Sequence, residues 1–442
     1  MDEVNIPRRA KVLVVGSGGR EHAIVDALSR SSRVEKIYCA PGNAGIARQA
    51  KCVPLADTQV DELADFAAQE GIDLTVVGPE VSLAAGIADE FEARGLKIFG
   101  PSKAAARIES SKDFAKSLMA KYNVPTAAYR TFSDYNEALV YVNAGKLPVV
   151  LKYDGLAAGK GVVVAETYEQ ADEALKDMLL DDKFGHGRVV VEEFLTGPEF
   201  SLLCFVNGSE VEPMELSQDH KRAFDNDEGP NTGGMGAYTP LPFITAKDEV
   251  YALEHIMKPI ASGMVSEGIP FHGVLYGGLM KTPDGIKVIE FNCRFGDPET
   301  EVVLPRLESD IFEIFWAVAN KTPMPLTKWY SDAVIGFVLA SKGYPGSYKK
   351  GFEIRGVDEV MKDPSVKVYH MGTSLKKLDG DGHEAFDKAG HSLVTNGGRV
   401  LMVLASAPTL KEAHDKALAA VEHIDCDNLF HRTDIGHWAF EK

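Results

Sequence analysis

The sequence contains few cysteines, and none of them is close to another along the chain. Five cysteines occur among 442 residues, and no CxxC spacing is present. A cysteine zinc site or a disulfide framework needs closely grouped cysteines, so the spacing argues against both. Single thiols are typical of a reducing compartment. The cysteines are Cys39, Cys52, Cys204, Cys293 and Cys426.

The sequence also lacks long apolar runs and blocks of basic residues. No run of about 18 apolar residues is present, which argues against a membrane span. The segment Met1–Ala10 is polar and has no apolar core of the kind found in signal peptides. The formal net charge is −18, and so acidic a surface repels nucleic acid phosphates. We therefore expect a cytoplasmic protein with no membrane or nucleic acid partner, and the lack of a long apolar helix favours a monomer.

The first hundred residues alternate short apolar runs with helical patterns. Each of the first three apolar runs is followed by a turn rich in glycine or proline. Repetition of strand, turn and helix predicts an α/β fold with a doubly wound parallel sheet, which binds ligands at the carboxyl ends of its strands. The expected strands are Lys11–Val15, Val34–Ala40, Leu74–Val77 and Lys97–Phe99, and the expected helices are Arg20–Leu28, Asp61–Gln69 and Leu83–Arg94.

The remaining chain is long enough for further domains, since the usual length prior gives roughly three for the whole. Pattern shifts divide it into a unit at about 131–200 and a larger stretch at about 201–327, which carries most of the unusual polar motifs. A small α/β domain at 329–442 follows, and the first sheet occupies 1–108.

The turn Gly16–Glu21 (GSGGRE) superficially matches a dinucleotide fingerprint. Its third glycine is missing because Glu21 stands there, and the second strand ends without an acidic residue for a ribose. A nicotinamide site is therefore disfavoured. The glycines still allow backbone amides to approach an anion at a helix N-terminus, and Arg20 adds positive charge. A phosphorylated substrate is the expected occupant, and a purely structural tight turn is the alternative.

Two further stretches suit a nucleotide. In Val149–Val164, Lys152 ends an apolar strand, and the glycine-rich loop around Lys160 can fold its amides over a polyphosphate. A β-hairpin with a solvated lysine is an equally good interpretation. In Val191–Glu199, backbone groups suit an adenine edge and Glu199 suits ribose hydroxyls, although an exposed strand edge explains this pattern equally well.

The stretch Val288–Glu299 (VIEFNCRFGDPE) carries the most specific pattern. Glu290 and Asn292 alternate on one face of a strand, so both can offer oxygen ligands to one hard cation. Phe291 faces the opposite way, into the core. Arg294 continues the polar face and suits a developing phosphoryl charge. A salt-bridged surface strand is the alternative.

Two polar, glycine-punctuated segments, Ser217–Arg222 (SQDHKR) and Pro230–Tyr238 (PNTGGMGAY), have the composition of binding loops. A surface excursion is the alternative interpretation for both.

Taken in order, these motifs resemble the ATP-grasp superfamily, and within it the glycinamide ribonucleotide synthetase (phosphoribosylamine–glycine ligase) family. The resemblance runs nearly from end to end. The combination of GSGGREHA with RFGDPE is its most specific part. The matching stretches are VLVVGSGGREHA, PGNAG, VVGPE, SKDFAK, LKYDGLAAGKG, EEFLTGPE, SQDHKR, GPNTGGMGAY, EFNCRFGDPETE, GYPG, TNGGRVL and DIG.

The resemblance implies an ATP-dependent carbon–nitrogen ligase of de novo purine biosynthesis. Glycine would be activated as glycyl phosphate and joined to 5-phosphoribosylamine, giving glycinamide ribonucleotide, ADP and phosphate. It also implies that 1–108 binds phosphoribosylamine, that 109–130 with 201–328 form the ATP-grasp core, and that 131–200 form its lid.

The resemblance further implies a role for each matching residue, with ATP as co-substrate and magnesium or manganese as the metal. ATP would contact Lys112, Lys152, Gly159, Lys160, Gly161, Glu192, Glu193, Phe194, Leu195 and Glu199. The metal ligands would be Glu290 and Asn292, and the catalytic residues would be Arg294, Asp297 and Lys221. The substrates would contact Gly18, Gly19, Arg20, Glu21, Asn43, Glu80, Asp219, His220 and Arg222.

One feature departs from the pattern of the wider superfamily. The strand expected at Val274–Lys281 carries no carboxylate where many members place a metal ligand, so the number of metal ions stays open.

Three rival functions are an ATP-grasp ligase that uses formate or bicarbonate, a nicotinamide-dependent oxidoreductase, and a nucleotide sensor without catalysis. The two specific motifs oppose the first, the missing glycine opposes the second, and the polar strand face opposes the third.

Overall fold

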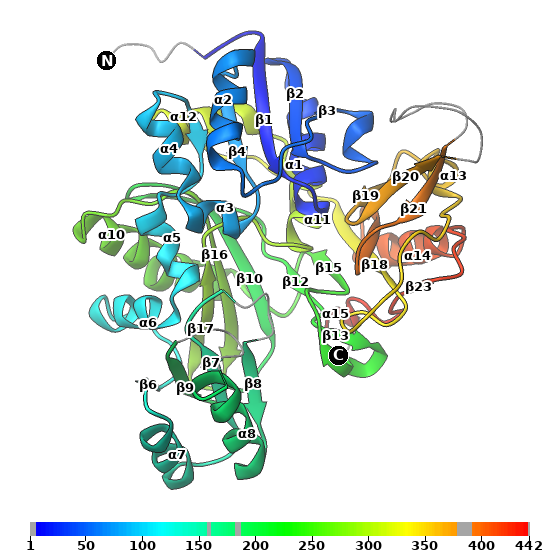
Figure 1. Ribbon diagram of the computed structural model, residues 1–442. Coiled ribbons are helices and arrows are strands. Elements are labelled where there is room, and N and C mark those ends of the chain that lie inside the picture. The colour runs from blue at the N-terminus through cyan, green and yellow to red at the C-terminus, as the bar shows by residue number, and fades with distance from the viewer. Residues whose placement is uncertain (1–5, 157–160, 182–186, 378–390, 441–442) are drawn as a thin grey trace.

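The computed structural model describes residues 6–156, 161–181, 187–377 and 391–440. Four main sheets and their helices form the molecule (Figure 1). None of the helices in these ranges is long and apolar enough to cross a membrane.

The N-terminal unit is a five-stranded parallel sheet with the order β3-β2-β1-β4-β5. Its central strand β1 is buried along nearly its whole length because neighbouring elements cover both faces. The predicted doubly wound parallel sheet is confirmed. The strands are β1 (Ala10–Gly16), β2 (Val34–Pro41), β3 (Lys51–Cys52), β4 (Leu74–Val77) and β5 (Ile98–Phe99), and the helices are α1 (Gly19–Ser29), η1 (Ile46–Arg48) and α2 (Val60–Glu70).

The single helix predicted for Leu83–Arg94 is wrong. The chain forms two helices, α3 (Glu80–Ala85) and α4 (Ile87–Ala93), which are separated at Gly86. Gly86 has φ +98°, a left-handed conformation that ends α3 and that glycine adopts without a steric cost.

The central unit is an antiparallel sheet with the order β11-β10-β16-β17. Helices α5 (Lys103–Ser110) and α6 (Lys112–Lys121) precede it in the chain and pack against β17. Ser111 caps α6, because its hydroxyl accepts a hydrogen bond from the amide of Phe114. The strands are β10 (Glu199–Asn207), β11 (Glu210–Pro213), β16 (His272–Thr282) and β17 (Gly285–Asn292), with α9 (Ala246–Ala252), η3 (Leu253–Met257), α10 (Lys258–Ser266), α11 (Glu299–Val303), η4 (Leu304–Arg306) and α12 (Ile311–Ala319).

The smaller unit extends from the lower end of the central sheet in Figure 1. Its antiparallel sheet has the order β6-β9-β7-β8, and helices α7 and α8 close a separate small core against it. The elements are β6 (Tyr129–Phe132), α7 (Tyr135–Ala144), β7 (Val149–Tyr153), β8 (Val162–Ala165), α8 (Tyr168–Leu179) and β9 (Val189–Glu193).

The C-terminal strands share their sheet with a segment from the middle of the chain. Strand β15 (Gly236–Thr239) pairs with β18 (Ala333–Ser341), and β12 (Gln218–Asp219) pairs with β15. Residues 218–219 and 236–239, which the sequence predicted to lie with the central unit, therefore join the C-terminal sheet, while β13 (Arg222–Phe224) and β14 (Glu228–Asn231) between them form a separate two-stranded sheet. The remaining elements are η2 (Asp225–Asp227), α13 (Val357–Val360), β19 (Val366–His370), β20 (Thr373–Lys377), β21 (His391–Thr395), β22 (Arg399–Ala407), α14 (Leu410–Val421), β23 (Leu429–Phe430) and α15 (His437–Phe440).

Candidate active site

The turn between β1 and α1 is filled by its own glutamate. The Glu21 carboxylate accepts a 2.6 Å hydrogen bond from the amide of Gly18 and a 2.6 Å bond from Nε of Arg20. It packs so closely on the end of β4 that a Cβ added to Gly78 would lie 1.9 Å from it. The sequence predicted an external anion at this turn, and in the structure the Gly18 amide is already bonded to Glu21.

Arg20 and Asn43 also form hydrogen bonds within the protein. The Arg20 guanidinium is buried and donates to the carbonyl of Phe295 at 3.2 Å. The side-chain nitrogen of Asn43 donates to the carbonyls of Ser17 and His370, while its oxygen accepts from the amides of residues 45 and 46. Asn43 therefore fixes the loop after β2 against the first strand and the C-terminal unit.

Arg294 is placed just beyond β17 and lies among carboxylates. Its guanidinium is 3.0 Å from Glu109 and 3.5 Å from Glu80, and it donates to Oδ1 of Asn292 at 3.2 Å. Burial opposes the charge of Arg294, but these two carboxylates outweigh it and raise the pKa of the guanidinium. Burial raises the pKa of Glu109. Glu109 lies at the end of α5 and was not predicted, because no local motif marks it.

Glu290 lies on β17 opposite Gly278 of β16, where the missing side chain leaves room for its carboxylate. Within the described residues, this carboxylate makes no hydrogen bond or ion pair. Burial would raise the pKa of Glu290, but Lys221, Lys152, Lys112 and Arg294 together lower it, so the group is ionised. A free carboxylate beside the amide oxygen of Asn292 has the hard oxygen donors that Mg²⁺ prefers, so these residues fit a divalent metal.

Two buried lysines share one carboxylate next to this face. Glu192 of β9 lies 3.0 Å from Nζ of Lys152 and 3.1 Å from Nζ of Lys116, and its other oxygen has no partner. Lys152 also donates to the carbonyl of Ile289, which connects the smaller unit to β17. Burial lowers the pKa of Lys116 to about 8. Lys116 was not predicted, although its position one helical turn after Lys112 is a signal that could have found it.

The remaining residues predicted for ATP surround the junction of the smaller and central units. Nζ of Lys112 donates to the carbonyl of Gly155 at 3.0 Å. The Glu193 carboxylate pairs with Lys287, and Phe194 is exposed. Leu195 lies in the connection between β9 and β10, Glu199 begins β10, and Gly161 precedes β8. The predicted Gly159 and Lys160 lie outside the described residues.

The motif Ser217–Arg222 is only partly brought into this site. Lys221 pairs with Asp219 at 2.8 Å. Burial lowers the pKa of Lys221, but Asp219, Tyr276 and further carboxylates outweigh this and raise it well above its usual value. Arg222 is exposed and donates to the carbonyl of Gly229 within its own loop, so it lies outside the cluster. His220, which follows β12, is buried.

Asp297 connects three units of the chain. Its carboxylate pairs with Arg399 at 2.9 Å and accepts a 3.4 Å hydrogen bond from the amide of Arg20. Arg399 starts β22 in the C-terminal unit and also donates to the carbonyl of Gly233 at 2.7 Å. Neither Arg399 nor the fully buried Glu301, which abuts Gly19, was predicted.

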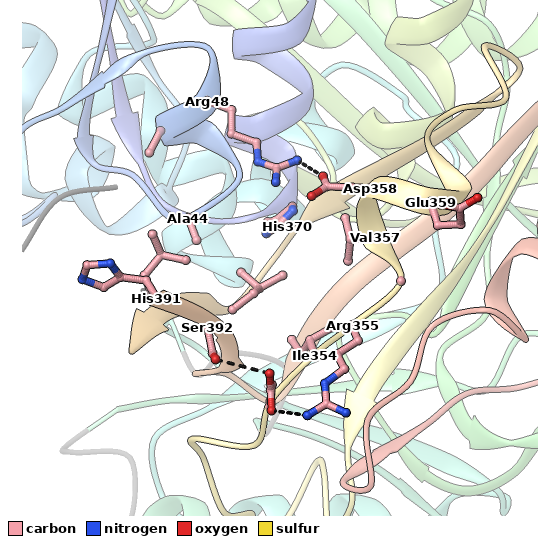
Figure 2. A pocket seen from close by; sticks show the side chains of 15 residues that line it. Ala44, Arg48, Ile354, Arg355, Val357, Asp358, Glu359, His370, His391 and Ser392 are labelled. Atoms are coloured by element: carbon pink, nitrogen blue, oxygen red, sulfur yellow. Dashed lines mark hydrogen bonds and ion pairs between the residues drawn. The ribbon is translucent and has the colours of Figure 1, made fainter. Parts of the chain in front are cut away.

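A separate cleft of about 610 Å³ lies between η1 and the C-terminal unit (Figure 2). Its charged walls are satisfied internally, because Asp358 pairs with Arg48 at 2.5 Å and Arg355 pairs with Glu353 at 2.7 Å. None of the predicted site residues lines it. We therefore place the candidate active site at the carboxyl ends of β1, β4 and β17.

Comparison with known proteins identifies the family of this chain. Three domain models of phosphoribosylglycinamide synthetase match the chain: the N domain over 10–109, the ATP-grasp (A) domain over 110–300 and the C domain over 334–438. The phosphoribosylamine–glycine ligase of Halalkalibacterium halodurans is 50% identical over 427 residues, which cover 96% of each chain. That of Listeria innocua is 49% identical over 96% of this chain and 99% of its own.

Solved structures show the same architecture. The phosphoribosylamine–glycine ligase of Thermotoga maritima superimposes with a TM-score of 0.82 at 31% identity, covering 97% of this chain and all of that one. A biotin carboxylase of Campylobacter jejuni, at 14% identity and a TM-score of 0.69 over 95% of this chain and 92% of its own, shares the fold alone.

Fold and site together define a ligase of the ATP-grasp class. Within that class, the chain belongs to the phosphoribosylglycinamide synthetase family, which confirms the resemblance seen in the sequence.

We predict that Glu290→Gln lowers the rate of ATP-dependent ligation at least about 100-fold, because the ionised oxygen offered to the metal is lost. Circular dichroism should show an unchanged fold. The surface variant Glu254→Gln is the matched control and should keep full activity. A Glu290→Gln enzyme with wild-type kcat and metal dependence would exclude this residue as a ligand.

We predict that Arg294→Lys lowers kcat about 100-fold while the KM for ATP stays within about threefold, because one ammonium cannot span the carboxylates and the transferred phosphoryl group. Steady-state kinetics with varied ATP gives both constants. A change confined to KM would contradict a role in the transition state.

Proposed function

We propose that the chain joins glycine to 5-phosphoribosylamine at the expense of ATP, giving glycinamide ribonucleotide, ADP and phosphate. The observation that carries this proposal is the identity of about half of all residues to phosphoribosylamine–glycine ligases over 96% of this chain. The site supports this proposal, because the lysines that suit a polyphosphate lie beside carboxylates that can accept hydrogen bonds from an amine and from hydroxyl groups.

In the first step, a carboxylate oxygen of glycine attacks the γ-phosphorus of ATP, and ADP leaves as glycyl phosphate forms. Lys112 and Lys152 bind the phosphates, and Arg294 stabilises the charge on the transferred group. Glu290 and Asn292 hold Mg²⁺ or Mn²⁺, which neutralises phosphate charge when bound.

In the second step, the amine of phosphoribosylamine attacks the carbonyl carbon of glycyl phosphate. The carbon–oxygen bond to phosphate breaks, the amide forms, and the amine loses a proton. Asp297 is suited to orient the amine because it lies where the N-terminal and C-terminal units meet. Asp219 and Lys221 line the space between the substrates. Water must be excluded until the amine arrives, since an acyl phosphate hydrolyses readily.

The residues proposed for the substrates form two groups, one at phosphoribosylamine and one at ATP. We propose that Gly18, Gly19, Arg20 and Glu80 contact phosphoribosylamine, with Glu21 and Asn43 shaping the loops that hold it. The loop that contains Gly159, Lys160 and Gly161 covers ATP, and Glu192–Leu195 with Glu199 contact its adenosine.

The units 1–108, 109–130 with 201–328, 131–200 and 329–442 act as substrate domain, ATP-grasp core, lid and C-terminal domain. The protein works in the cytoplasm as a monomer.

Phosphate release from Mg-ATP tests the proposal, with glycine and with phosphoribosylamine generated in the assay. We expect release only when both substrates are present, and none when formate or bicarbonate replaces glycine. Release with another carboxylate in place of glycine would keep the ATP-grasp chemistry and overturn the substrate assignment.

A further inference from the structure

The segment after β23 lies directly on the loop that carries Asp219 and Lys221. The amide of Gly436 donates a 2.9 Å hydrogen bond to Nε2 of His220, whose side chain is buried. Gly436 has φ +85°, a left-handed conformation that glycine adopts without strain. The contact joins residues that are 216 positions apart in the chain.

Ion pairs of one buried guanidinium with partly exposed carboxylates hold this segment in place. Arg432 is 1% exposed, pairs with Asp227 at 2.9 Å and donates to both oxygens of Asp434 at 2.7 and 2.8 Å. Asp434 also accepts from the amide of Asn226. Breaking a buried pair leaves an uncompensated charge, so this arrangement fixes the segment strongly against residues 222–227.

His220, Asp227 and His437 place potential ligand atoms within 4.8 Å of one another, as a metal site would. The hydrogen bonds argue against a metal. Nε2 of His220 accepts from Gly436, so the proton of the neutral ring must be on Nδ1, facing Asp227 at 3.9 Å. A cation on Nδ1 would require an imidazolate, and Arg432 already occupies Asp227.

His220 stands between the two residues that reach the active site. Side chains alternate along an extended chain, so Asp219 and Lys221 face the opposite side from His220. The backbone of His220 is bonded on both sides, with its amide to the carbonyl of Gly236 and its carbonyl to the amide of Met235. Holding the ring of His220 therefore holds its two neighbours.

We propose that His220 is a positioning residue: the segment Arg432–His437 grips its ring and so sets the Asp219–Lys221 pair for the ligation. This inference rests on the proposed function for the reaction that it serves. It assigns a task to the C-terminal segment, which contacts no reacting atom itself.

The test compares His220→Phe with His220→Gln. Phenylalanine keeps a ring but removes the acceptor for Gly436, whereas the side-chain oxygen of glutamine can replace it. We expect kcat to fall about tenfold in His220→Phe, with the KM for ATP within about twofold, and to recover at least half of that loss in His220→Gln, since one hydrogen bond corresponds to about that factor. The exposed His255→Phe is the matched control and should match the wild type.

Hydrogen exchange gives a readout that does not depend on activity. Amides 219–222 should exchange at least about tenfold faster in His220→Phe than in the wild type or His255→Phe. Equal exchange and an unchanged kcat in His220→Phe would overturn the inference. Wild-type enzyme without glycine-dependent phosphate release would instead overturn the proposed function, and the exchange comparison would still decide the role of His220.

The pH profile separates positioning from a general loss of stability. Burial lowers the pKa of His220. The nearby charges of Arg432 and His437 lower this pKa further, whereas Asp227 raises it. The neutral ring is therefore favoured in the folded protein, and its bond from Gly436 is lost only as the pH falls below the ordinary histidine range. An acid limb of kcat in the wild type should be absent in His220→Gln. The same limb in both enzymes would assign it to another group and contradict the inference.

Discussion

The pairing of buried guanidinium groups with carboxylates is the interaction on which the site depends. Arg294 forms ion pairs with Glu80 and Glu109, and Arg399 forms one with Asp297. These pairs join the end of β4, the end of α5, the loop after β17 and the start of β22. A buried charge without a partner costs several kcal/mol, so the units must meet in one arrangement for the charges to be satisfied.

The same constraint explains how an acidic chain can hold polyanionic ligands. The net charge is −18, yet Lys112, Lys116 and Lys152 gather where the smaller unit meets the central sheet. One carboxylate, Glu192, is shared by two of these lysines, which leaves positive charge for the phosphates of a nucleotide. Carboxylates instead dominate around the β1–α1 turn, where acceptors for an amine and for hydroxyl groups are useful.

Patterns that are local in sequence predicted the structure well. Alternation of apolar runs with helices gave the parallel sheet, and alternation along β17 placed Glu290 and Asn292 on one side and Phe291 in the core. The left-handed conformation of Gly86 divides the helix predicted for Leu83–Arg94. The prediction missed this break because an apolar pattern alone does not show the conformation of a glycine.

Residues that act across long sequence separations could not be found in this way. Glu109 and Arg399 are placed in the site only by the tertiary fold, since each meets a partner more than a hundred positions away. Glu21 is an example of the opposite kind, a residue with a local role. The motif predicted that it contacts a substrate, and in the structure its carboxylate caps its own helix. Motif resemblance predicts which positions form the site, while the contacts show which groups each side chain already bonds.

The transfer of labelled oxygen from glycine to phosphate tests the central claim, which is that the site activates a carboxylate as an acyl phosphate. Glycine labelled with ¹⁸O in its carboxylate is supplied with Mg-ATP and phosphoribosylamine, and the released phosphate is analysed by mass spectrometry. The account predicts one labelled oxygen in each phosphate, because the bond broken in the second step leaves the former carboxylate oxygen on phosphorus. Unlabelled phosphate formed together with the amide product would contradict an acyl phosphate intermediate.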